Sequence, residues 1–205
     1  IRVGDPIVLA QSMIHLAGNR IASRAIDNRI GAFIVLEAIR MLSDNLPAAR
    51  VTAVATAQEE IGQSGGGARA SAYQLEPDVA IVVDVTFSTD VPDVEKKELG
   101  EHRLGGGPVL SRGSASHNSV FEMLSSVAEE EEIPYTIQAS PRSTRTDADG
   151  IHLTRGGVPT GLISVPNRYM HSPNEVVSVD DLFNTAKLIA AFVRRLRVET
   201  DFTPR

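Results

Sequence analysis

The chain has 205 residues, 42% apolar and 22% charged, which is the composition of a globular protein with room for one good core. Its net charge of -6 and its lack of a basic stripe argue against nucleic-acid binding, so we expect no nucleic-acid partner. The sequence contains no cysteine, which excludes disulfides and thiolate metal sites and leaves histidine and carboxylate as metal ligands.

The first elements are short. Residues 1–9 and 12–25 have the pattern of short strands broken by Gly-Asp-Pro and Gly-Asn turns. From residue 28 the apolar period becomes helical, and the predicted helix ends before Asn45-Leu-Pro. Its periodic residues are Ile30, Phe33, Ile34, Ala38, Met41 and Leu42.

Two apolar runs in the middle of the chain predict buried strands. The first covers residues 50–58, and the second covers 78–86 and ends in an acid, Asp84. Between them, residues 65–75 predict a helix with a glycine-rich entry. Residues 87–108 are polar and glycine-rich, so we predict a long surface loop there.

The remaining elements alternate between strand and helix. Strands are predicted at 108–113, 133–139 and 158–165, with a short helix at 147–157. Longer helices are predicted around Val120–Val127 and from Asp180 onward. This order predicts an α/β fold with a mostly parallel central sheet flanked by helices. No apolar run approaches the roughly 20 residues of a membrane span, so we expect a cytoplasmic protein without a membrane partner.

Polar side chains with useful chemistry stand at the ends of these elements. The ends of parallel strands meet at one edge of an open sheet, where ligands bind. Each residue also has a simpler interpretation: Asp27 as a helix cap, Asp84 as a strand end, and His171 as a solvated loop residue. The set is Asp27, Glu59, Glu60, Asp84 and His171.

The adjacent pair Glu59 and Glu60 is the hardest of these to explain as structure alone. It directly follows an apolar run, where two like charges are costly unless a cation compensates them. Oxygen and imidazole ligands suit zinc, cobalt or manganese. We therefore predict a pair of divalent metals, with one glutamate as ligand and its neighbour as general base.

Several motifs resemble those of the tetrahedral (TET) metallo-aminopeptidases, which include glutamyl aminopeptidases and proteins historically labelled cellulase M. The resemblance runs from about Gly4 to the C-terminus. It rests on "AIDNRIGAF", "VATAQEEIGQSGG", "VDVT", "TDADGIHLTRGGVPTGLISVP" and "RYMHSP". It implies a phosphorylase/hydrolase-like domain that removes N-terminal residues from peptides, using two divalent ions, with zinc or cobalt favoured over manganese.

The resemblance also implies roles for individual residues. Asp27 would bridge the two metals, Glu60 and His171 would complete one site, and Asp84 would serve the other. Glu59 would be the general base.

In the family, the second site takes a further histidine from an upstream H-x-D motif, which none of the five histidines of this chain matches. We therefore expect the chain to be the C-terminal part of a longer protein. Residues 1–20 would close an inserted β-barrel domain, and residues 21–205 would form the catalytic domain. The family assembles as dodecamers, so self-association is expected.

Two other functions remain open at this stage. A glycosidase would use Glu59 and Glu60, but it needs carboxyls about 5–9.5 Å apart on opposite sides of a bond. A non-catalytic module of the same fold would have an incomplete metal site. For substrate preference, Arg145, Thr146 and Asp147 lie in a loop that the resemblance places near the site. Arg145 in a substrate pocket would favour acidic N-terminal residues.

Overall fold

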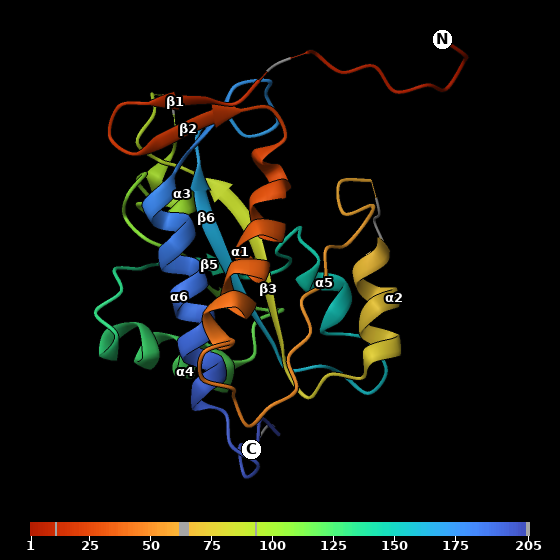
Figure 1. The fold of residues 1–205 in the computed structure, drawn as a ribbon, viewed down its shortest axis with the longest axis vertical. Helices are drawn as coiled ribbons and strands as arrows, with labels where there is room; N and C mark the ends of the chain where they lie inside the picture. The colour runs from red at the N-terminus through yellow and green to blue at the C-terminus, as the bar shows by residue number, and fades with distance from the viewer. Residues whose placement is uncertain (11, 62–65, 93, 204–205) are drawn as a thin grey trace.

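A computed structural model of the chain describes residues 1–10, 12–61, 66–92 and 94–203, and its secondary structure forms two sheets with helices packed around them (Figure 1). The larger sheet has the strand order β3-β6-β4-β5, with bounds β3 (Ala80–Phe87), β4 (Val109–Gly113), β5 (Thr136–Ser140) and β6 (Thr160–Asn167). The pairs β3–β6 and β4–β5 are parallel, and only a short β4–β6 contact is antiparallel. The predicted α/β class with a parallel-rich sheet is confirmed.

The smaller sheet is antiparallel and has the order β1-β2-β7. Its strands are β1 (Ile14–Leu16), β2 (Arg20–Ser23) and β7 (Glu175–Ser178). β7 was not predicted from the sequence, and it leads directly into the last helix. Because β2 pairs with β7, the β1–β2 hairpin near the N-terminus is hydrogen-bonded to the strand that directly precedes the last helix. The division into domains 1–20 and 21–205 stays a prediction.

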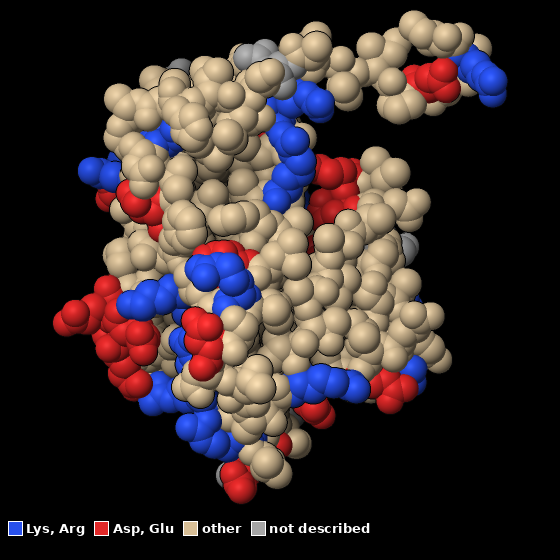
Figure 2. Space-filling view, in the orientation of Figure 1, with Lys and Arg blue, Asp and Glu red and all other residues tan. Residues whose placement is uncertain are grey.

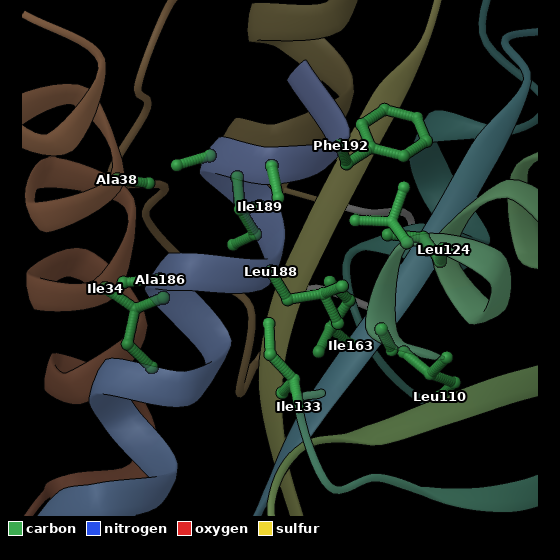
Figure 3. Close-up of a cluster of buried hydrophobic side chains, with 14 of the residues drawn as sticks. Ile34, Ala38, Leu110, Leu124, Ile133, Ile163, Ala186, Leu188, Ile189 and Phe192 are labelled. Carbon is green, nitrogen blue, oxygen red and sulfur yellow. The ribbon is translucent and has the colours of Figure 1, made fainter. Parts of the chain in front are cut away.

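Two long helices lie side by side over one face of the larger sheet: α1 (Ile26–Leu42) and α6 (Val179–Arg195). Apolar residues recur at helical spacing in both helices, which places one face of each helix in the core. Phe33 of α1, which the spacing assigned to that face, is instead 42% exposed. The helix α4 (Asn118–Glu130) packs beside them on β4. Figure 3 shows how side chains from these helices and the sheet meet in the core, among them Ile34, Leu124, Ile163, Leu188 and Phe192.

The other face of the sheet carries a smaller apolar cluster under the short helix α5 (Ala148–Ile151). Because side chains alternate along a strand, Val82 and Leu162 point to this face, whereas Val85 and Ile163 point to the main core. The helix α2 (Gly66–Leu75) packs against α5. The first residue of the predicted range 65–75 lies outside the described residues.

Three predictions of local structure are wrong. Residues 1–9 form no strand and are exposed, because they pair with none of the described strands. Residues 50–58 form no strand and are half-buried or exposed, since β3 is hydrogen-bonded to β6 on one side and the 50–58 segment does not pair with it. A strand needs a partner as well as β-branched residues, and local sequence does not supply the partner. The 87–108 region is not simply a surface loop: it contains α3 (Lys96–Leu99), and Ser88, Thr89 and His102 are buried. None of the helices in the described parts of the chain is long and apolar enough to cross a membrane.

Candidate metal centre

Asp27 stands just before the regular part of α1, where the backbone of Asp27 and Asn28 is not helical. The capping interaction belongs to Asn28, whose side-chain oxygen accepts a hydrogen bond from Gly31 N–H at 2.8 Å. The Asn28 amide also donates to the carbonyl of Val83 in β3, at 2.8 Å. Asp27 is therefore not the cap of this helix, and its side chain, only 9% exposed, faces other acidic groups.

His171 and Glu60 meet Asp27 from two other parts of the chain. His171 Nε2 lies 3.2 Å from Asp27 Oδ2 and 3.5 Å from Glu60 Oε2. One ligand atom from each of the three residues lies within 4.8 Å of the other two. Two carboxylates and one imidazole at this spacing fit the donor set of a divalent cation such as zinc, cobalt or manganese.

The acidic groups around this cluster repel one another. Burial raises the pKa of Asp27 to about 6, and the charges of Glu60 and Glu175 add to the rise. Burial also raises the pKa of Glu59 to about 7, with Glu60 and Asp147 adding to it. Repulsion among neighbouring carboxylates is relieved either when some of them are protonated or when cations bind between them. The raised pKa values of these carboxyls agree with a metal centre at this position.

Asp84 is close to these groups but outside the cluster of three. It lies within β3, three residues before the end of the strand, and shares the strand face of Val82, on the side of α5. Burial raises the pKa of Asp84 to about 8, against the lowering effect of a hydrogen bond from Val85 N–H, and Asp27 and Glu59 add repulsion. Asp84 is therefore electrostatically coupled to the centre, and its role as a ligand of a second metal stays a prediction.

Asp147 is a buried carboxyl beside the same group. Burial raises its pKa, and the Thr56 hydroxyl, which donates to Asp147 Oδ2 at 2.6 Å, opposes the rise. Its Oδ1 is buried and has no hydrogen-bond partner among the described residues. Asp147 thus adds negative charge to the side of the site that Asp84 faces.

The loop that carries Arg145 is held together by Asp149. The Asp149 carboxylate accepts hydrogen bonds from the backbone N–H groups of Thr144 and Arg145. The Thr146 hydroxyl accepts from Ala148 N–H. Among the described residues, no hydrogen bond or ion pair involves the guanidinium of Arg145, so neither Asp147 nor Asp149 neutralises it. Its predicted contact with substrate remains untested.

A cavity of about 1120 Å³ opens beside the carboxylates, between α1, β3 and residues 48–61. Its lining includes Asp27, Glu59, Glu60 and Asp147, together with apolar residues of α1 and β3. Figure 2 shows acidic surface recessed in a hollow of the visible face, next to a strip of Lys and Arg. A site of this kind combines apolar walls with a few convergent charged groups, as ligand-binding pockets do.

The sequence analysis missed Glu175, the first residue of β7, which is 1% exposed and hydrogen-bonded to the backbone of Asp27 and of His171. A local signal was present, because a glutamate directly precedes the apolar pair Val176-Val177. An acid at the start of a buried strand is costly unless it is hydrogen-bonded.

Comparison with known proteins identifies the family to which the chain is similar. A family model described as M42 glutamyl aminopeptidase matches residues 1–188. The chain is 37% identical over 203 residues to a lysyl aminopeptidase of Pyrococcus furiosus, covering 99% of this chain and 56% of the relative.

Two solved structures are also similar. The TET aminopeptidase of Thaumarchaeota archaeon SCGC AB-539-E09 matches with a TM-score of 0.89 at 33% identity, over 97% of this chain and 56% of that one. The TET1 peptidase of Pyrococcus horikoshii, described as assembling into a tetrahedron or a large octahedral shell, matches with a TM-score of 0.75 at 28% identity. That match covers 92% of this chain and 54% of the other. The chain thus spans just over half the length of the relatives it matches.

Proposed function

Because the chain belongs to the M42 glutamyl aminopeptidase family, we propose that it forms the metal-binding part of an aminopeptidase, which removes residues from the N-terminus of peptides. The observation that carries the proposal is the cluster of Asp27, Glu60 and His171, whose ligand atoms lie within 4.8 Å of one another. Since the chain spans just over half the length of its relatives, the activity of the whole protein is part of the proposal.

Asp27, Glu60 and His171 would hold one divalent cation, zinc or cobalt by preference and manganese as an alternative. Asp84 would serve a second cation, with Asp27 shared between the two. When bound, such cations polarise the scissile carbonyl and make water a stronger acid. The charge of the cations would also offset the burial and the mutual repulsion that together raise the pKa values of Asp27 and Asp84.

Glu59 would act as the general base. It adjoins the ligand Glu60 and is only partly exposed. In the metal-free protein, burial raises the pKa of Glu59 to about 7, with the charge of Glu60 adding to the rise, so this carboxyl can hold a proton near neutral pH. The carboxylate of Glu59 would take a proton from the attacking water and return it to the leaving amine. The nitrogen of the bond between the first and second residues would then leave as a neutral amine, the new N-terminus of the shortened peptide.

Self-association is the second part of the proposal. The Pyrococcus horikoshii TET1 peptidase is described as assembling into large shells, and this chain shares its fold over 92% of its own length. We infer that the whole protein is likewise oligomeric. Mass measurement in solution tests this separately from activity.

The test of activity uses the full-length protein with matched peptides. One peptide has a free N-terminus and the other is identical but N-acetylated, and a cello-oligosaccharide serves as the glycan. We expect divalent-metal-dependent release of the first residue from the free peptide alone. Hydrolysis of the glycan would establish the glycosidase instead, and metal binding without hydrolysis of any substrate would establish a non-catalytic module.

A further inference from the structure

Glu175 is a buried acid at the junction of two segments that carry the proposed metal ligands. It begins β7 and is 1% exposed, so water does not solvate its charge. A buried carboxylate is tolerated only where hydrogen bonds replace water. The donors that replace water here come from two separate parts of the chain, residues 26–27 and residues 167–171.

Both carboxylate oxygens of Glu175 are used, each by two N–H donors. Oε2 accepts from the backbone N–H of Ile26 at 2.6 Å and of Asp27 at 3.3 Å. Oε1 accepts from the side-chain amide of Asn167 at 3.1 Å and from the backbone N–H of His171 at 3.2 Å. One side chain therefore bonds to the backbone of Asp27 and to the backbone of His171, which are far apart in the sequence.

We propose that Glu175 is a positioning residue, which holds the backbones of Asp27 and His171 at the separation that a shared cation requires. The inference rests on the proposed function, since it takes Asp27 and His171 as ligands. It adds that the affinity of the site depends on a buried residue that does not itself contact the cation.

The segment around His171 needs such a support. The side chain of His171 is 63% exposed, so packing does not fix the imidazole. Its backbone has a φ of +63°, and the nearby Tyr169 has +59°, a region that side-chain-bearing residues adopt only when surrounding contacts hold them there. The hydrogen bond from His171 N–H to Glu175 is such a contact.

A carboxylate suits this position because it accepts hydrogen bonds on both oxygens. A glutamine amide has the same shape but accepts on one side and donates on the other. The glutamine oxygen would still accept hydrogen bonds from one of the two pairs of N–H donors. Its NH₂ group would face the other pair and could accept no hydrogen bond from it. Glu175→Gln therefore removes the link between the two segments without leaving a cavity.

The test measures metal affinity and folding separately in the 205-residue chain. Co²⁺ binding by calorimetry at a fixed pH is compared between wild type and Glu175→Gln, and urea unfolding is measured for both. We expect the variant to bind Co²⁺ about 10- to 100-fold more weakly, which is the usual effect of removing a group that orients metal ligands. In the full-length protein, excess Co²⁺ should restore kcat, because the ligands themselves are intact.

Asp181 provides a matched control. It is a fully buried carboxylate that also accepts two backbone N–H groups, those of Gly105 and Gly107, in a loop that carries no proposed ligand. Asp181→Asn should lower stability and leave Co²⁺ affinity unchanged. If Glu175→Gln does not fold, Asn167→Ala is the alternative variant. It removes the hydrogen bond from the Asn167 amide to Glu175 Oε1 and should also lower the affinity for Co²⁺.

The outcomes separate the inference from the proposed function. Weakened binding in Glu175→Gln with unchanged binding in Asp181→Asn supports the positioning role. Equal affinity in wild type and Glu175→Gln, or equal losses in both variants, overturns it and leaves the metal site standing. A wild-type chain that binds no Co²⁺ overturns the proposed function, and the positioning role with it.

Discussion

Replacing Asp84 by asparagine in the metal-free protein removes one titrating group from the interior and keeps its shape. Asp84 is 7% exposed, and burial raises its pKa from 3.8 to about 8. Between these values the folded protein binds a proton that the unfolded chain has released, so the free energy of unfolding falls as pH rises. From pH 5 to pH 8 this covers almost three pH units, and at 1.36 kcal/mol per unit Asp84 accounts for a loss of about 4 kcal/mol in the free energy of unfolding.

The assay is urea unfolding with EDTA at pH 5 and pH 8, for wild type and Asp84→Asn. The variant retains an oxygen that accepts the hydrogen bond from Val85 N–H, which is 2.8 Å long in the wild type. We expect the variant to lose about 4 kcal/mol less than wild type between the two pH values. Asp27 and Glu59, whose pKa values are raised to about 6 and about 7, contribute to the slope that remains, as do the buried carboxyls of Asp147 and Asp181. If both proteins lose the same stability, ionisation of Asp84 does not oppose folding, and the electrostatic argument for the centre fails.

Other predictions concern the metal and the reaction. In the full-length protein Glu59→Gln should retain metal but lose at least about 10²-fold in turnover, whereas Glu60→Gln should weaken metal binding; the reverse pattern would exchange the two roles. Elemental analysis of the 205-residue chain should find one cation bound tightly and the Asp84 site weak or empty, since that site has fewer protein ligands; two equally tight cations would contradict this. Comparison of kcat/KM for Glu-, Leu- and Lys-anilides should show a preference for the acidic residue of roughly tenfold to a hundredfold, which Arg145→Ala reduces. A Leu or Lys preference unchanged by that substitution would remove Arg145 from the pocket.

The elements best predicted from the sequence are those formed by local interactions. The apolar spacing of Ile30, Ile34, Ala38 and Leu42 identified α1, because residues at that spacing lie on one face of any helix they form. The apolar runs around β3 and β6 indicated buried strands, because continuous runs rich in β-branched residues are typical of strands buried on both faces. The candidates Asp27, Glu60 and His171 also came from their places beside such elements and from motif resemblance, and the structure brings their ligand atoms together.

What only the tertiary structure decided depends on contacts between distant residues. Residues 50–58 have the composition of a strand but no partner, and Asn28 rather than Asp27 caps α1. The role of Glu175 was not visible, since its hydrogen bond to Ile26 N–H joins positions 149 residues apart. The local sequence restricts which helix or strand a residue can join, but it does not specify the distant partners of that residue. A buried carboxylate loses its water when the chain folds, and backbone N–H groups must then donate the hydrogen bonds that water had supplied. Only the tertiary structure determines which N–H groups lie close enough to do so.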